Sequence, residues 1–269
     1  MSFYFGEKTW PQLKEYLVKD AVVLIPVGEL EEHSLYLPVD TDARIAKFLT
    51  DQIAEEVEDE IPVLVMPTVW SGYTPDFVGK WPGAMRLPPQ VFIDMMHGIC
   101  ASLADMGFRK VVMVDCHGQH APFLNIVTKL IADEYDMYYV VASPLVFSAK
   151  EFNAVRKSER GGVSHACEWE ASMMMRIDPD LVYPELFTDV DKMEYQTDFV
   201  SADSALGGQK VVWSSWGIQH TEHGALGDPS QACVETADVI IAAVRKNFKD
   251  FLLQYYRNNP ADRLFPHAQ

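Results

Sequence analysis

The sequence has few cysteines, and none of them are paired at short spacing. Four are present among 269 residues, at Cys100, Cys116, Cys167 and Cys233. Zinc ribbons and disulfide frameworks need cysteines at short, regular spacings, so the sequence predicts neither. Reduced thiols in a cytoplasmic protein are the simplest interpretation.

Long apolar runs and an excess of basic residues are also absent. No run approaches the ~20 residues that span a bilayer, and the N-terminal segment carries charges from Glu7 onward, unlike a signal peptide. The chain has 22 Lys and Arg against 39 Asp and Glu, for a net charge of −17. Such an acidic surface repels phosphate backbones and anionic lipid, so we expect neither a nucleic-acid nor a membrane partner.

What the sequence does contain is a regular alternation of strand and helix patterns. Short apolar runs at 21–27, 62–66, 110–114 and 137–142 predict strands. Helical periodicity predicts helices at 42–57, 92–106, 123–133, from His165 onward, and at 230–255. The stretches 70–87 and 180–227 predict loops and short elements, the first rich in Gly, Pro and aromatics. We therefore predict one α/β domain over residues 1–269, with a mainly parallel sheet in a three-layer α/β/α sandwich.

Polar clusters follow the first and third predicted strands. Glu31 and His33 are two residues apart in extended chain, so both side chains can reach one ion or two neighbouring ions, and Asp42 can bridge. His117 lies just past the third strand. Ligands gather beyond the carboxyl ends of parallel strands, which brings these residues to one edge of the sheet. Imidazole and carboxylate ligands suit zinc, manganese or iron.

A third cluster begins at His165 and includes Glu168 and Glu170. On a helix, His165 and Glu168 share a face, whereas Glu170 points about 200° away from Glu168. Taken singly, the first cluster is better explained as a charged surface loop with Asp42 as a helix cap, and the third as a charged helix N-terminus. The second is as consistent with a local turn as with metal ligation.

In their order along the chain, these motifs resemble the creatininase (creatinine amidohydrolase) family. Residues 26–33 resemble its Pro-x-Gly-x-x-Glu-Gln-His signature, followed by Leu-Pro and Thr-Asp at 37–38 and 41–42. Residues 115–120 occupy the place of its Asn-Gly-His-Gly-Gly-Asn motif, and 165–172 follow its His-Ala-Gly-Glu-x-Glu-Thr-Ser motif. The resemblance extends over about residues 7 to 250.

The resemblance implies a binuclear metal site and hydrolysis of carbon–nitrogen bonds, often in small cyclic amides or formamides. Glu31, Asp42 and His117 would hold one divalent ion, and His33, Asp42 and a glutamate the other, with Zn, Mn and Fe all acceptable. We assign Glu168 as that glutamate and Glu170 as its support, and leave the choice between the two open. His165 is the candidate for protonating the leaving group, so His165 and Glu168 form the catalytic set; a helix-start histidine bonded to backbone is the alternative. Homo-oligomers, specifically hexamers, are expected from the family.

The departures from the family motifs bear on the substrate. Gly118 stands where true creatininases place a tyrosine, and Leu145 stands at a tryptophan position, so creatinine is not the expected substrate. Asp115 and His120 replace asparagines, and Glu32 replaces a glutamine. The leading hypothesis is hydrolysis of a small cyclic amide or formamide. The alternatives are ring opening of a cyclic keto-polyol, as in 3-dehydro-scyllo-inosose hydrolases, and a catalytically silent binding protein.

Overall fold

Four parallel strands form the sheet of the computed structural model, which describes residues 2–188, 190–192, 197, 199, 201–207, 211 and 221–257. They are β1 (Val22–Val27), β2 (Val63–Val65), β3 (Lys110–Asp115) and β4 (Val140–Ala142), in the order β2-β1-β3-β4. Val22 of β1 is in register with Val63 of β2 and with Lys110 of β3. These are the four strands predicted from the apolar runs.

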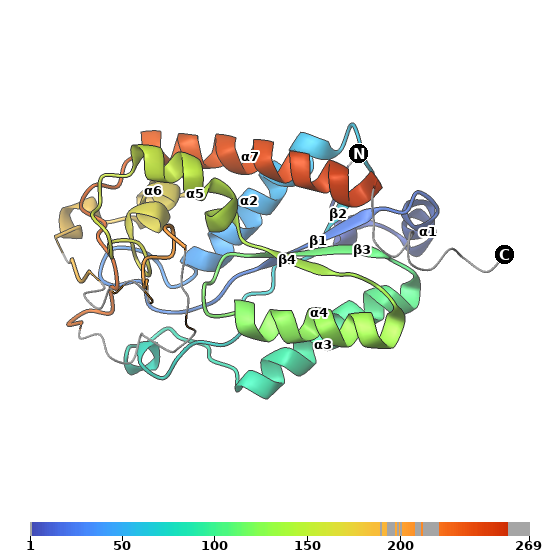
Figure 1. Ribbon diagram of the computed structural model, residues 1–269, viewed down its shortest axis with the longest axis horizontal. Helices are drawn as coiled ribbons and strands as arrows, with labels where there is room; N and C mark the ends of the chain where they lie inside the picture. The colour runs from blue at the N-terminus through green and yellow to red at the C-terminus, as the bar shows by residue number, and fades with distance from the viewer. Residues whose placement is uncertain are drawn as a thin grey trace.

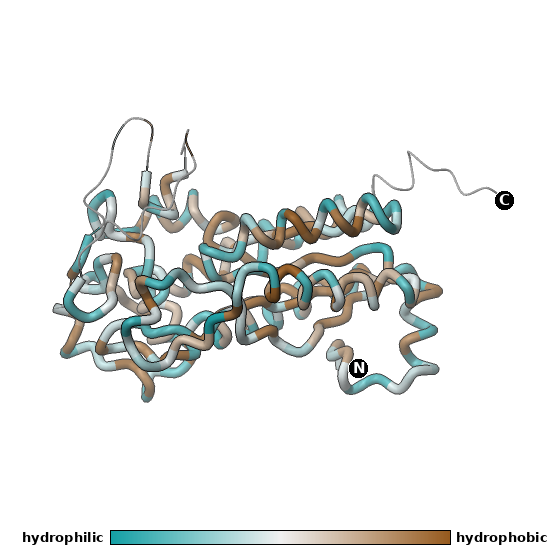
Figure 2. The backbone as a smooth tube through the Cα atoms, turned by 90° about the horizontal axis from the view of Figure 1, so that it is seen from below, coloured by the Kyte–Doolittle hydropathy of each residue, from teal (hydrophilic) through white to brown (hydrophobic). Residues whose placement is uncertain are grey.

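Helices cover both faces of this sheet, which confirms the α/β fold class (Figure 1). Because side chains alternate along a strand, Val22 and Leu24 enter one core and Val23 and Ile25 the other. The first core includes side chains of α2 (Thr41–Val57), α5 (Pro144–Val155), α6 (Glu168–Ile177) and α7 (Val234–Arg257), and the second includes those of α3 (Pro89–Met106) and α4 (Ala121–Tyr135). Along these helices the tube alternates between hydrophobic and hydrophilic colour, as expected for amphipathic helices (Figure 2).

Most helices lie where the periodicity predicts them. They are α2 (Thr41–Val57), α3 (Pro89–Met106), α4 (Ala121–Tyr135), α6 (Glu168–Ile177) and α7 (Val234–Arg257). Helix α6 begins later than predicted, because Ala166 has a φ of 50° and Cys167 is the N-cap. His165 therefore precedes the helix rather than starting it.

Two helices were not predicted. Helix α1 (Trp10–Val18) has no fully buried residue and packs on the second core only through the partly buried Leu13, Tyr16 and Leu17. Helix α5 (Pro144–Val155) places Ser148 in its buried face between Pro144 and Phe152, which interrupts the pattern. Short 3-10 turns complete the described elements: η1 (Phe5–Glu7), η2 (Val78–Lys80), η3 (Pro179–Leu181) and η4 (Pro184–Leu186).

In this strand order, the direction in which strands are added reverses between β1 and β3. From β1 the chain passes to β2 on one side, returns to β3 on the other side, and then continues to β4. This reversal of direction is a topological switch point, where open parallel sheets bind their ligands. None of the described helices is both long and apolar enough to cross a membrane.

Candidate metal centre

The polar clusters predicted from the sequence meet at the carboxyl ends of β1 and β3. Glu31 and His33 follow β1, Asp42 lies in the first turn of α2, and His117 follows β3. Side chains of all four are buried almost completely. Unpaired charges are costly in such surroundings, so their mutual contacts define what the site can bind.

Asp42 directs its two carboxylate oxygens at two different histidines. Its Oδ1 lies 3.2 Å from Nε2 of His33, and its Oδ2 lies 3.0 Å from Nδ1 of His117. A carboxylate with one oxygen toward each of two imidazoles has the arrangement needed to bridge two cations.

Backbone carbonyls fix the tautomers of both histidines. His33 donates its Nδ1 hydrogen to the carbonyl of Glu31 at 3.2 Å, and His117 donates its Nε2 hydrogen to the carbonyl of Tyr73 at 3.2 Å. The nitrogens that face Asp42 are then the ones that can offer a lone pair to a metal. Metal-binding histidines are commonly oriented in this way by the hydrogen bond of the other ring nitrogen.

Glu31 leaves one buried oxygen without a hydrogen-bond partner. Its Oε2 accepts the Thr74 hydroxyl at 2.8 Å, but its Oε1 has no such partner among the described residues. That Oε1 lies 3.3 Å from Nδ1 of His117 and 3.2 Å from Nδ1 of His165. A divalent cation would bind the lone pairs of this oxygen and of the nearby imidazole nitrogens together, so the residues present fit a metal ion.

Within the described part of the chain, three groups of carboxylate and imidazole side chains have potential ligand atoms within 4.8 Å of one another. Asp42 belongs to two of them and so joins them into a two-ion arrangement. The groups are Glu31 with Asp42 and His117; His33 with Asp42 and Glu170; and Glu31 with His33 and His165.

The electrostatics of the cluster favour a cation. Burial raises the pKa of Glu31, but the imidazoles of His117 and His165 outweigh this effect and hold its pKa well below the ordinary value. Burial lowers the pKa of His117, yet the carboxylates of Glu31 and Asp42 raise it well above its usual range. Positive charge beside these carboxylates is therefore favoured, and a metal ion would supply it.

Comparison with known proteins agrees with this geometry. The family model of creatininase (creatinine amidohydrolase) matches residues 6–252. The chain belongs to the creatininase family.

Named relatives within and around this family are distant. The 3-dehydro-scyllo-inosose hydrolase of Thermotoga maritima is 26% identical over 197 residues, covering 70% of this chain but only 60% of that protein. The creatinine amidohydrolase of Pseudomonas putida is 27% identical over 200 residues, covering 67% of this chain and 74% of that one. A manganese form and a mutant zinc–zinc form of creatininase share the fold, with TM-scores of 0.77 and 0.76 at 21% and 22% identity; each covers 95% of this chain and 99% of its own.

Within this creatininase fold, the third motif contributes Glu170 rather than Glu168 to the ligand groups. Glu168, the predicted metal ligand and catalytic residue, is fully buried but belongs to none of these groups. Its carboxylate accepts the amide hydrogens of Lys157 at 3.1 Å and Ser158 at 2.8 Å. The two glutamates point in different directions because they are two residues apart on a helix. Glu170 is therefore the better candidate for the fifth ligand.

His165 lies inside the cluster although it precedes α6. Its Nε2 donates to the carbonyl of Glu32 at 2.7 Å, which turns Nδ1 toward Oε1 of Glu31. The hydrogen bond to the backbone and the position near the ligands, which were predicted as alternatives, therefore occur together.

A small cavity of about 50 Å³ adjoins the cluster. It is bounded by Glu170 and Trp169 of α6, by the predicted specificity positions Gly118 and Leu145, and by three serines and two cysteines: Ser143, Ser164, Ser204, Cys116 and Cys167. A Cβ on Gly118 would meet nothing within 4 Å, so the missing side chain leaves open space there.

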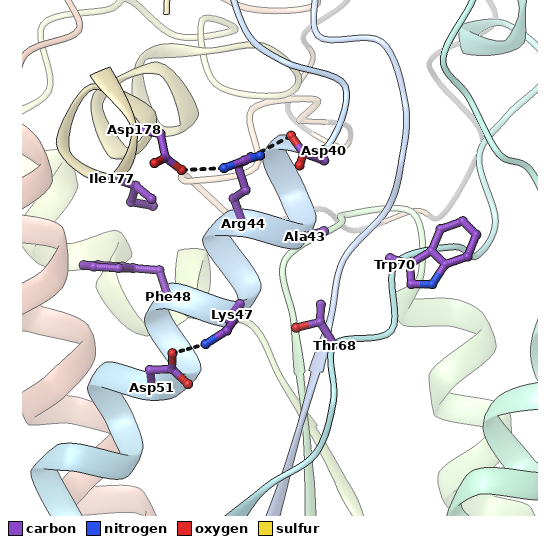
Figure 3. A pocket seen from close by; sticks show the side chains of 10 residues that line it. All are labelled: Asp40, Ala43, Arg44, Lys47, Phe48, Asp51, Thr68, Trp70, Ile177 and Asp178. Atoms are coloured by element: carbon purple, nitrogen blue, oxygen red, sulfur yellow. Dashed lines mark hydrogen bonds and ion pairs between the residues drawn. The ribbon is translucent and has the colours of Figure 1, made fainter. Parts of the chain in front are cut away.

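A larger cavity of about 420 Å³ lies along the outer side of α2 and contains none of the candidate ligands. Figure 3 shows Arg44 between Asp40 and Asp178, and Lys47 on Asp51, so its basic groups are already paired. Because it contains no candidate metal ligand, this larger cavity is less suited to metal-dependent catalysis than the small cavity beside Glu170.

Tyr73 and Thr74, which bind His117 and Glu31, were not among the site residues predicted from the sequence. The only signal was their place in the loop 70–87, which was predicted to be functional or irregular. The sequence left Trp81 as either a wall of the pocket or a core residue; it packs on Phe77 and does not line the cavity beside the cluster. His97, expected to have no ligand role, pairs with Glu134. His220, expected at the surface of the predicted loop 180–227, lies outside the described residues.

Proposed function

We propose that this protein is a binuclear metal-dependent hydrolase of a small molecule. The observation that carries the proposal is the Asp42 carboxylate, with one oxygen toward His33 and one toward His117. Glu31, Asp42 and His117 would hold one ion, and His33, Asp42 and Glu170 the other. Two bound divalent ions would supply polarisation of a substrate carbonyl and a water acidic enough to attack it. Zinc, manganese and iron all accept these ligands.

The residues around the ligands support proton transfer. His165 holds its Nε2 hydrogen on the Glu32 carbonyl, so a proton on Nδ1 faces the cluster. Burial lowers the pKa of His165, but the carboxylate of Glu31 raises it well above the ordinary value. We assign His165 to protonation of the leaving group.

The leading substrate class is a small cyclic amide or formamide, the kind of carbon–nitrogen bond that the creatininase family implies. Creatinine itself is disfavoured, because Gly118 and Leu145 line the cavity where aromatic side chains would enclose its ring.

Ring opening of a cyclic keto-polyol is a second candidate, favoured by a specific observation. Ser143, Ser164 and Ser204 line the cavity beside Glu170, and hydroxyl groups of this kind pair well with a hydroxylated ring. The relative from Thermotoga maritima is named for a hydrolase of an inosose. Release of ammonia, amine or formate from cyclic amides, compared with acid production from inosose-type ketones, separates the two classes.

The proposal of a binuclear centre is tested by removing the bridge. We expect Asp42→Ala to lose both ions and all hydrolytic activity. Elemental analysis of the purified protein measures the bound metal, and product release measures the activity. Asp40→Asn is the matched control, because Asp40 lies two residues earlier, is paired with Arg44 and should leave both ions bound. Full activity in Asp42→Ala would refute the bridging role. Wild-type protein with well under one ion per chain, and no activation by manganese or zinc, would favour the silent binding protein.

Assembly into homo-oligomers, specifically a hexamer, and a cytoplasmic location remain predictions from the family and the composition.

A further inference from the structure

The backbone of Tyr73 lies between two buried histidines. Its carbonyl accepts the Nε2 hydrogen of His117 at 3.2 Å, and its N–H donates to Nε2 of His120 at 3.2 Å. The first bond turns Nδ1 of His117 toward Asp42, 3.0 Å away. One peptide segment therefore connects the orientation of a candidate metal ligand to His120, which has no place in the ligand groups.

The residues on either side of Tyr73 strengthen this connection. A Cβ at Gly72 would lie 2.3 Å from Nε2 of His120, so the chain can approach the imidazole only because residue 72 has no side chain. Thr74 donates its hydroxyl to Oε2 of Glu31 at 2.8 Å. The segment 72–74 thus touches His120 and orients both Glu31 and His117, two ligands of the same candidate ion.

His120 is itself held on every side. Because Nε2 accepts the Tyr73 N–H, the ring hydrogen lies on Nδ1, which donates it to Oδ1 of Asp115 at 3.3 Å. Oε2 of Glu29 lies 3.2 Å from the same Nε2, and the ring of Phe92 packs 4.4 Å away. Oδ1 of Asp115 also accepts the backbone N–H of His117 at 3.2 Å. Because His120 is completely buried, rotating its ring would break these contacts with no water to replace them.

We propose that His120 is a positioning residue for the ion held by Glu31, Asp42 and His117. It fixes the Tyr73 backbone, whose carbonyl selects the tautomer of His117 that offers Nδ1 to the metal. His33 takes its tautomer from the carbonyl of Glu31 instead, so the ion beside His33 and Glu170 does not depend on His120. This inference rests on the proposed binuclear centre.

A purely structural role for His120 makes a different prediction. Loss of core packing would lower the affinity for both ions or for neither. Substitution of a neighbouring residue that makes no polar contact would then have the same effect. Phe92→Leu is that matched control, since Phe92 is fully buried against the His120 ring. His120→Gln tests rescue, because an amide oxygen near the place of Nε2 can still accept the Tyr73 N–H.

The experiment is titration of metal-stripped protein with Mn²⁺ by isothermal calorimetry, with elemental analysis of the loaded samples. For His120→Leu we expect one of the two ions to bind about 10- to 100-fold more weakly, as found when partners of metal-binding histidines are removed. The other ion should keep its wild-type affinity. His120→Gln and Phe92→Leu should both bind two ions with affinities close to wild type. Where His120→Leu does not fold, the same variant combined with Glu29→Gln and Asp115→Asn removes the buried charges left unpaired and carries the same test.

Unchanged affinities in His120→Leu, with two ions bound to wild-type protein, would overturn the positioning role and leave the proposed function intact. Equal weakening in Phe92→Leu would likewise assign the effect to packing. Wild-type protein that binds no Mn²⁺ would overturn both the binuclear centre and this inference.

Discussion

At the N-terminus of α6, Glu170 completes a group with His33 and Asp42, whereas the Glu168 carboxylate accepts backbone amide hydrogens from Lys157 and Ser158. Burial raises the pKa of Glu170, although His33 and His165 act in the opposite direction. A bound cation would stabilise its charged form. At the scale of single residues, the chemistry thus depends on the directions of two side chains that lie two positions apart.

Exchange of these two glutamates for glutamine tests that assignment. Glu170→Gln should lose the ion shared with His33 and most of the activity, because a neutral amide is a poorer ligand than a carboxylate. Glu168→Gln should keep both ions but lose about 1–3 kcal/mol of stability, since charged acceptors of buried amide hydrogens are lost. Metal content by elemental analysis and unfolding by urea measure the two effects. Loss of an ion from Glu168→Gln alone would restore Glu168 as the ligand.

At the scale of secondary-structure elements, the site depends on how closely the end of β1 approaches the start of α2. A Cβ at Gly28 would lie 2.5 Å from the backbone nitrogen of Ala43 and 2.7 Å from the carbonyl carbon of Asp42. These are backbone atoms that cannot move without shifting the helix. The glycine of the Pro-x-Gly motif therefore sets the place of Asp42 relative to Glu31 and His33.

Gly28→Ala should accordingly displace the first turn of α2 and reduce ion binding as well as stability. The expected loss of stability is on the order of 1–3 kcal/mol, typical of overpacking in a tight interior. Gly98→Ala is the control: it lies within α3, its Cβ would meet nothing within 4 Å, and alanine there should add about 0.5–1 kcal/mol. Thermal unfolding and Mn²⁺ titration measure both variants. Wild-type ion affinity in Gly28→Ala would show that the approach of β1 to α2 does not place Asp42.

At the scale of the whole molecule, the buried cluster links metal binding to folding and to pH. In the metal-free protein, burial lowers the pKa of His33, but Asp42 raises it above its ordinary value. Burial also lowers the pKa of His117, but Glu31 and Asp42 raise it well above its ordinary value. Protons on these histidines stabilise the metal-free fold fully below their unfolded pKa, and this contribution is lost as the pH rises through the folded pKa. A metal ion competes with the same protons, so its affinity rises with pH.

Removal of metal by a chelator should therefore lower the Tm more at about pH 8 than at about pH 6, the range on either side of the ordinary histidine pKa. A ligand present at 100 times its Kd adds about 2.7 kcal/mol, so the shift at the higher pH should amount to several degrees. Scanning calorimetry with and without chelator at both pH values provides the measurement. A shift that is equal at both pH values, or larger at about pH 6, would contradict proton competition at His33 and His117.

Much of this molecule could be predicted from its amino-acid sequence. The apolar runs ending near Val27 and Asp115 predicted the strands because residues buried on both faces of a parallel sheet are apolar throughout. The approximate position of α2 followed from Ile45, Leu49 and Ile53, which recur at helical spacing. Helix α5 was missed because Ser148 occupies a buried position where periodicity requires an apolar residue.

The sequence by itself determined the sheet, its flanking helices and a family motif set that includes Glu31, His33, Asp42 and His117. Local patterns suffice for these features, since strand burial, helix periodicity and motif spacing are written in neighbouring residues. Only the tertiary structure decided that Glu170 joins His33 and Asp42, and that Tyr73 and Thr74 orient His117 and Glu31. Those contacts depend on the exact direction of side chains and of a backbone carbonyl from segments far apart in the chain, and no spacing within one segment contains that information.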